Sequence, residues 1–213
     1  MTGNSEDIII IAMRVRRYVV FLGAVLLVIS ISGIVYASRV ALAQGKYGWA
    51  KLMTPADDWC NILDLSESAS HIYSANYYAC ILAAETAYFS SFGLSDKDAA
   101  ENINKSQKWC DKGLKANSYR MQLHRLKTCL MARSSIPDAA RYWERCVDWQ
   151  FWEPANQALL VELYARTGQY EKAVDSLILI KESSYYAEAS GRLNDAWKKE
   201  KDFPSDMKAM RLK

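Results

Sequence analysis

The stretch ALLVELYARTGQYEKAVDSL, residues 158–177, contains two apolar runs of helical period separated by a glycine. Leu160 and Tyr164 are four residues apart in the first run, so they share one face of a helix. Gly168 follows this run, and glycine is the residue that most often ends a helix. The stretch therefore predicts a helical hairpin, in which the small Ala173 of the second run lets the two helices approach closely.

A related pattern occurs 34 residues upstream, in LHRLKTCLMARSSIPDAARYW, residues 123–143. Five pairs of residues correspond at this spacing: Leu123 and Gln157, Leu126 and Leu160, Leu130 and Tyr164, Ala139 and Ala173, and Trp143 and Leu177. One period further upstream, Trp109 fits the series, whereas Lys105 stands where a small residue is expected. On these residues the chain resembles the tetratricopeptide-repeat (TPR) family, whose unit is a 34-residue helical hairpin. The resemblance implies two clear repeats, one divergent repeat and a capping helix at 185–200.

The rest of the chain predicts further helices and no strand, because no stretch alternates at period two. Thr54 and Pro55 form a helix start signal, and SDKD at residues 95–98 has the form of a capping box. Helical runs are predicted at 70–91, 96–113, 118–133, 137–150, 155–167, 170–183 and 185–200. We therefore expect an all-α chain: an N-terminal transmembrane helix, a stalk or helical continuation with a first helix at 38–69, a TPR-like solenoid at 70–200, and a tail at 201–213.

The predicted anchor is YVVFLGAVLLVISISGIVYA, residues 18–37, which contains no charged residue and is long enough to cross a bilayer. It is longer than the apolar region of a cleaved signal peptide, although ALA at residues 41–43 resembles a cleavage site. Three basic residues precede the run closely and three follow it more thinly: Arg14, Arg16 and Arg17, then Arg39, Lys46 and Lys51. The clustering predicts a cytoplasmic tail at 1–17 and a periplasmic domain at a bacterial-type inner membrane, and the equal counts leave the opposite orientation open.

Small residues recur on one face of the predicted anchor. Gly23, Ser30 and Ala37 are seven residues apart, and Gly33 lies beside them. Small residues let helices pack closely in lipid, so this face predicts a contact with another transmembrane helix; simple exposure to lipid is the alternative.

Composition argues against several classes of function. The chain has 27 basic and 24 acidic residues. Four arginines and two acidic residues precede residue 44, so the rest of the chain has 23 basic and 22 acidic residues. This balance lacks the basic stripe of a nucleic-acid-binding domain. The common catalytic and nucleotide-binding motifs are absent, and His71 and His124 fall on different predicted helices. We therefore predict no catalytic residue, metal, cofactor, small-molecule substrate or nucleic-acid partner.

The TPR resemblance also implies a binding site. In that family the first helix of each repeat lines a concave groove that holds a segment of a partner. Transferred by position, the groove consists of Met121, His124, Thr128 and Met131 in one repeat and Ala158, Glu162 and Arg166 in the next. The lysine and asparagine set that clamps a carboxylate in chaperone-binding members is missing, so the composition favours an apolar helix or loop as the partner. The alternative is that these residues face water or a neighbouring helix.

An aromatic cluster follows the clearest tryptophan of the repeat. YWERCVDWQFW, residues 142–152, has five aromatic residues, of which Trp143 is predicted to be in the core. Trp149, Phe151 and Trp152 cannot all point inward at one helix end, so they predict an exposed patch for protein contact. A sugar-stacking platform is the alternative, but no polar constellation accompanies it.

The five cysteines form no C-x-x-C pair. Cys80 and Cys110 are at similar distances from the turn at Gly93, so antiparallel helices would bring them to a similar level. We predict an intrachain disulfide between them if the domain is extracytoplasmic, and a buried thiol at Cys146.

These features together predict a non-enzymatic, single-span membrane protein whose TPR-like domain is a structural or assembly subunit of a larger membrane complex. Its partners would contact both the transmembrane helix and the solenoid. The alternative is an adaptor in envelope biogenesis that joins secretion, pilus or polysaccharide machinery transiently. An enzyme such as a glycan-acting hydrolase would need convergent carboxylates, which no spacing predicts.

Overall fold

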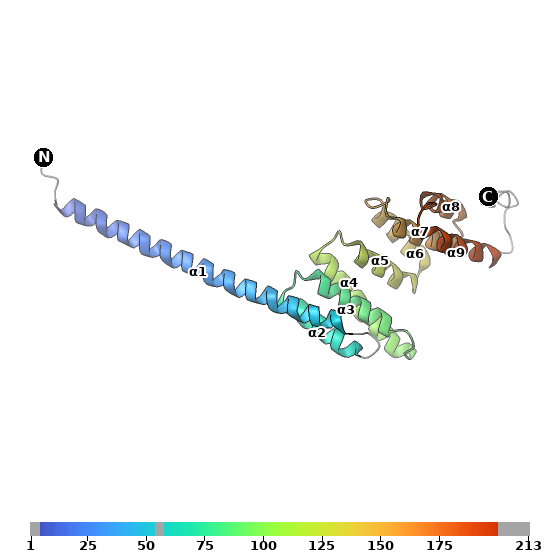
Figure 1. Ribbon diagram of the computed structural model, residues 1–213, viewed down its shortest axis with the longest axis horizontal. Helices are drawn as coiled ribbons and strands as arrows, with labels where there is room; N and C mark the ends of the chain where they lie inside the picture. Colours follow the sequence, from blue (N-terminus) through green and yellow to red (C-terminus); the bar gives the residue numbers. More distant parts are fainter. Residues whose placement is uncertain (1–4, 54–57, 200–213) are drawn as a thin grey trace.

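The computed structural model describes residues 5–53 and 58–199, and the side chains of residues 16–53 and 58–198. Every regular element within these residues is an α-helix, as expected (Figure 1). Thr54, Pro55 and the predicted tail at 201–213 lie outside the described residues. The helices are α1 (Ser5–Leu52), α2 (Trp59–Ile72), α3 (Tyr77–Ser90), α4 (Asp96–Ala116), α5 (Met121–Ala132), α6 (Ile136–Val147), α7 (Pro154–Arg166), α8 (Tyr170–Leu179) and α9 (Tyr186–Lys199).

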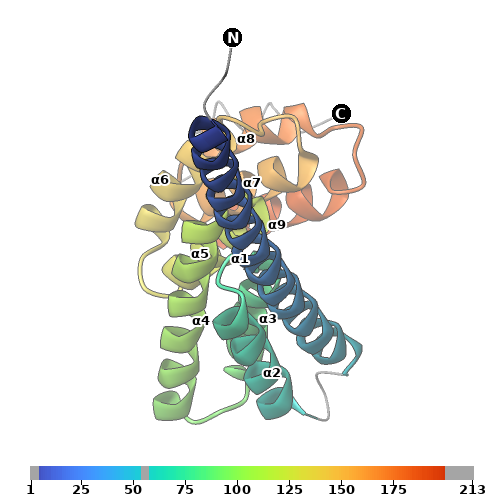
Figure 2. The same cartoon turned by 90° about the vertical axis from the view of Figure 1, so that its left-hand side faces the viewer.

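Consecutive helices pack in antiparallel pairs. The end of α1 packs against α2, α3 packs against α4, α5 against α6 and α7 against α8, while α9 packs against both α7 and α8. The pairs stack into an elongated domain from which α1 projects (Figure 1). Viewed from the free end of α1, this helix crosses in front of the stacked hairpins (Figure 2).

Helix α1 combines the predicted anchor with the first helix of the domain. It runs for 48 residues without a break, and its part from residue 16 is long and apolar enough to cross a membrane. Its last turns pack against α2, where Ala43 and Ala50 are buried. The Tyr36 hydroxyl lies 3.1 Å from the Tyr73 hydroxyl, and Arg39 Nε donates to the Ile72 carbonyl at 3.2 Å. Of the two possibilities for residues 38–53, the structure has the helical continuation.

The helix predicted at 70–91 is divided in the structure. Helix α2 ends at Ile72 and α3 begins at Tyr77, because Asn76 caps α3 by accepting a hydrogen bond from the Ala79 amide at 3.3 Å. Ser95 caps α4, as its place in the predicted capping box requires, since its Oγ accepts from the Asp98 amide at 3.4 Å. The Asp98 carboxylate accepts from the Ser95 hydroxyl at 2.8 Å rather than from the Ser95 amide.

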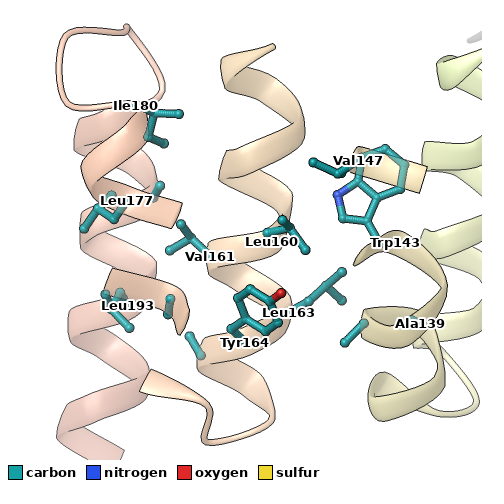
Figure 3. Close-up of a cluster of buried hydrophobic side chains, with 14 of the residues drawn as sticks. Ala139, Trp143, Val147, Leu160, Val161, Leu163, Tyr164, Leu177, Ile180 and Leu193 are labelled. Carbon is teal, nitrogen blue, oxygen red and sulfur yellow. The ribbon is translucent and has the colours of Figure 1, made fainter. Parts of the chain in front are cut away.

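The larger of two apolar cores joins α5 to α9. Trp143 is fully buried, and its indole Nε1 donates to the Asn156 carbonyl at 3.0 Å. Ala139 and Ala173 are both fully buried, which confirms that the hairpin helices approach closely at the small residues of the repeat. Figure 3 shows this core, with Trp143 and Val147 of α6 facing Leu160 of α7, and Leu177, Ile180 and Leu193 on its other side.

The second core lies between α3, α4 and α5. It combines the small buried residues Cys80, Ala83, Ala84 and Cys110 with the larger Ile81, Trp109, Leu123, Leu126 and Leu130. Gly113 of α4 shows how closely the helices approach there: a Cβ atom at this position would lie 2.7 Å from Leu123 Cδ1 and 3.0 Å from Cys80 Cβ. Any larger residue would force α4 away from α5.

Candidate protein-binding surfaces

A groove of about 470 Å³ lies where the inner helices of successive hairpins meet. Helix α3 forms one wall, α5 forms the floor, and the turn before α7 with the first residues of α7 forms the other wall. Its lining is Glu85, Tyr88, Phe89, Met121, Gln122, Arg125, Leu126, Cys129, Gln150, Glu153 and Asn156.

Hydrogen bonds join polar side chains of different helices along this groove. Gln122 Nε2 donates to Glu85 Oε1 at 2.7 Å, and Arg125 Nη2 donates to Asn156 Oδ1 at 3.0 Å. Burial raises the pKa of the Glu85 carboxyl, and the Gln122 hydrogen bond and the charge of Arg120 act against this shift. Nε of Arg125 is buried without a hydrogen-bond partner among the described residues. The groove thus combines polar side chains with the aromatic surface of Tyr88 and Phe89.

The groove residues predicted on α5 lie mostly on a different face of that helix. Thr128 is fully buried and donates to the His124 carbonyl at 2.9 Å, and Met131 packs against the larger core. Met121 is almost buried, although it also reaches the groove. The lining side chains of α5 are instead one position along, at Gln122, Arg125 and Cys129. One residue rotates a helix by about 100°, so the predicted stripe points towards the core rather than the groove.

His124 joins two elements of the domain by hydrogen bonds and does not line the groove. Its Nε2 lies 2.8 Å from the Ser118 carbonyl, and its Nδ1 lies 2.6 Å from the Tyr142 hydroxyl. A carbonyl only accepts, so Nε2 carries the proton and Nδ1 accepts from Tyr142. The histidine thus ties the turn before α5 to α6.

A thiol lies close to this histidine, since Cys146 Sγ is 3.4 Å from His124 Nδ1. Burial raises the pKa of the Cys146 thiol, and the predicted burial of this residue is confirmed. A catalytic cysteine needs a lowered pKa and access to substrate, so the geometry favours packing over nucleophilic chemistry. Among the described residues, no group of three His, Cys, Asp or Glu is placed to hold a metal ion.

The groove residues predicted on α7 face α9. Glu162 forms ion pairs with Arg166, at 3.6 Å, and with Arg192 of α9. A second hollow of about 920 Å³ lies beside these residues, and Ala158 lines a smaller one between α7 and α9. Helix α9 thus occupies the position of a next repeat, and neither hollow shares a lining residue with the groove at α5.

The predicted aromatic patch lies in the turn between α6 and α7. Phe151 and Trp152 are 59% and 66% exposed, and their rings meet edge to face with centroids 5.6 Å apart. Trp149 is half-buried and packs against Tyr119 and His124. Two large apolar side chains therefore stand in solvent, and their contact with a protein stays a prediction.

The predicted disulfide is not formed in the structure, where Cys80 and Cys110 are buried free thiols of the smaller core. Cys80 is level with Gly113, about one helical turn beyond Cys110, and its Sγ lies 3.4 Å from Ser70 Oγ of α2. The thiol of Cys80 thus faces α2, because the two helices are offset along their axes.

The predicted packing face of the anchor is open. Nothing in the described part of the chain lies within 4 Å of a Cβ placed at Gly23 or Gly33, and Ser30 Oγ bonds only to the Leu26 carbonyl at 2.9 Å. Ala37 is exposed as well. A helix-packing role for this face stays a prediction.

Neither a protein-family model nor a curated protein matches the sequence. Two solved structures share its arrangement of helices. TTC0263, a thermophilic TPR protein of Thermus thermophilus, aligns with a TM-score of 0.61 and 11% identity over 73% of this chain and 81% of its own. YrrB, described as a TPR protein with an unusual peptide-binding site, aligns with a TM-score of 0.54 and 15% identity over 72% of this chain and 75% of its own. At such identities the likeness concerns the fold, and the chain has the fold of a TPR-like helical-repeat protein.

Proposed function

We propose that this protein is a membrane-anchored, non-catalytic scaffold that holds a segment of a partner protein and acts as a structural or assembly subunit of a membrane complex. The observation that carries the proposal is the groove between α3, α5 and the start of α7. TPR-like folds are protein-interaction folds, and YrrB, which shares the fold, is described as having a peptide-binding site.

The chemistry of the groove suits an extended segment with apolar side chains. Tyr88 and Phe89 offer apolar surface, while the side chains of Gln122 and Arg125 offer donors to main-chain carbonyls of a bound segment. An extended peptide presents such carbonyls at regular intervals, whereas a helix consumes them internally. We therefore favour an extended apolar segment over the helix that the sequence alone allows.

Helix α1 supports the membrane part of the proposal. It is long and apolar enough to span a bilayer, and the apolar part is not covered by the rest of the described chain. A partner held in the groove would thus be concentrated at the membrane surface.

The test is purification of the tagged full chain in mild detergent, followed by identification of what copurifies. A partner at fixed stoichiometry supports a structural subunit, and a partner that exchanges in pulse-chase labelling favours the transient adaptor. A variant with Gln122→Glu places two carboxylates side by side at Glu85 and is expected to reduce copurification about tenfold, which corresponds to about 1.4 kcal/mol. Gln107→Glu, on the exposed face of α4, is the matched control. If Gln122→Glu retains every partner at wild-type levels while the chain stays folded, the groove is not the binding site.

A further inference from the structure

The turns that join one hairpin to the next all lie along one edge of the domain. Each hairpin is antiparallel, so the turns 73–76, 117–120 and 148–153 return to the same edge. Side-chain contacts run along this edge: Arg120 lies over the ring of Tyr78, in the first turn of α3, at 5.4 Å, and Tyr119 meets Trp149 edge to face at 5.6 Å. We call this row of turns the hairpin-junction edge.

The hairpin-junction edge begins where the uncharged run of α1 ends. Tyr36, the last residue but one of that run, contacts Tyr73 ring to ring at 5.9 Å. Arg39, the first charged residue after it, bonds to the carbonyl of Ile72 at the end of α2. Figure 1 shows that the free part of α1 leaves the domain on this same side. No flexible linker separates the span from the edge, because α1 is a single helix.

Exposed aromatic residues continue along the edge away from α1. Tyr119 is 75% exposed, and Phe151 and Trp152 follow in the next junction. Tyrosine and tryptophan are enriched at the level of lipid headgroups, because each combines an apolar ring with a polar group. Phe151 adds an apolar ring beside Trp152. Arg39 and Arg120 lie on the same edge, and Asp148 and Glu153 in the outer turn balance their charge, so the aromatic rings rather than net charge favour contact with lipid.

We propose that the hairpin-junction edge lies on the membrane that α1 crosses, with Tyr119, Phe151 and Trp152 in its headgroup layer. This inference rests on the membrane anchoring proposed above. The hairpins step sideways from α1 in Figure 1, and single spans tilt by about 20° on average, so a tilt towards the hairpins lowers the outer turns to the bilayer. The solenoid would then lie along the membrane, and the aromatic patch serves lipid rather than protein.

The experiment measures tryptophan fluorescence of the purified full chain in vesicles of phosphatidylcholine and phosphatidylglycerol. A fraction of the phosphatidylcholine is brominated near the headgroup end of its acyl chains, and bromine quenches only tryptophans that reach it. We expect Trp152→Phe to remove part of the quenched emission. Trp49→Phe is the matched control: Trp49 is 68% exposed on α1 but lies about 18 Å past the end of the uncharged run, beyond the headgroup layer.

Two further readings separate the possible failures. Flotation of the vesicles shows whether the chain is inserted, so a wild-type protein that does not float contradicts the anchoring itself. If the protein floats and Trp152→Phe leaves lipid quenching unchanged while removing emission that aqueous iodide quenches, the edge faces water. That result would overturn the proposal and return the patch to protein contact. Both substitutions keep an aromatic ring, and circular dichroism verifies that the variants remain helical.

Discussion

Two interfaces of the domain hold their helices together in different ways: the larger core between α5 and α9, and the interface between α2, α3 and α4, which we call the small-residue core. Between α5 and α9, large side chains such as Trp143, Leu163 and Leu193 fill the space. Between α2, α3 and α4, the fully buried residues are mostly small, including Ala83 and Ala84. Polar atoms of small residues bond across that interface, since Ser106 Oγ of α4 donates to the Ala84 carbonyl at 2.7 Å.

This difference shows how the sequence of a repeat can diverge while its helical hairpin is retained. Large side chains stabilise by the apolar area that they bury, whereas small ones let backbones approach and gain contacts along the whole helix. The small-residue core is thus expected to tolerate truncation and resist enlargement, and the large-residue core to behave in the opposite way.

The largest expected effect is the loss of Trp143. Trp143→Ala leaves a cavity and removes the indole hydrogen bond to the Asn156 carbonyl, so the free energy of unfolding is expected to fall by about 3–5 kcal/mol. Cys110→Ala in the small-residue core removes a single buried sulfur and is expected to cost about 1 kcal/mol. Denaturant unfolding of the full chain in detergent, followed by circular dichroism, measures both. Equal losses would break the distinction between the cores.

Replacing a residue by a larger one is expected to destabilise the small-residue core more than the region around α9. Gly113→Ala inserts a methyl group against Leu123 and is expected to destabilise the protein by about 1–3 kcal/mol. Gly191→Ala is the matched change in α9, where a Cβ meets nothing within 4 Å, and is expected to stabilise the protein by about 0.5–1 kcal/mol. Thermal unfolding of the two variants should therefore shift in opposite directions, and a common direction would contradict the close approach at Gly113.

The helix starts of the two halves differ as well. Asn76 caps α3 with its side chain, so Asn76→Ala is expected to cost about 1 kcal/mol, while Asn76→Ser retains an oxygen acceptor and most of the stability. Glu153 precedes α7 without a side-chain cap bond, and Pro154 begins that helix. Glu153→Ala is accordingly expected to change stability by less than about 0.5 kcal/mol in the same denaturation measurement.

A further effect concerns the dependence of stability on pH, and its sign differs between two glutamates. Burial raises the folded pKa of Glu85, so its charge opposes folding above that pKa, and this cost disappears as the pH falls to the ordinary value. The hydrogen bonds from Lys172 and then Tyr164 lower the folded pKa of Glu144, so its stabilisation is present above the ordinary value and is lost as the pH falls to the folded one.

Substitution by glutamine separates these contributions. At neutral pH Glu85→Gln is expected to raise the stability, and Glu144→Gln is expected to lower it by up to about 1 kcal/mol. Unfolding measured from neutral to acidic pH should show the differences from wild type shrinking in both variants. A Glu85→Gln variant less stable than wild type would show that the interactions of the Glu85 charge with Gln122 and Arg120 outweigh the cost of its burial.

The repeat signal was sufficient for the second half of the fold. The small residues at Ala139 and Ala173 and the glycine at Gly168 are local requirements of a hairpin, so they can be read from the sequence. Gly168 indeed has a positive φ of 72°, a conformation that favours glycine. Segment 70–91 was harder, because no glycine or proline marks its break and Asn76 resembles any polar residue within a helix.

The residues that line the groove cannot be predicted from the sequence, for a geometric reason. Thr128 and Cys129 have similar size and polarity, and only the packing of α6 decides which one is buried. The predicted disulfide depends on counting from Gly93, whereas Cys80 lies ten residues before the end of α3 and Cys110 lies fourteen residues after the start of α4. Helix offsets of one turn depend on tertiary contacts and leave no local signature.

The unbroken course of α1 has a consequence for how the protein is oriented. Because one helix carries both the small-residue face of the anchor and the first contacts of the solenoid, the two share a fixed rotational phase about its axis. Adding a single residue between Ala37 and Val40 would turn the groove by about 100° relative to that face and raise it by about 1.5 Å. The length of α1 therefore fixes the direction in which the groove faces relative to the small-residue face of the anchor. A segment bound in the groove would take the same fixed orientation.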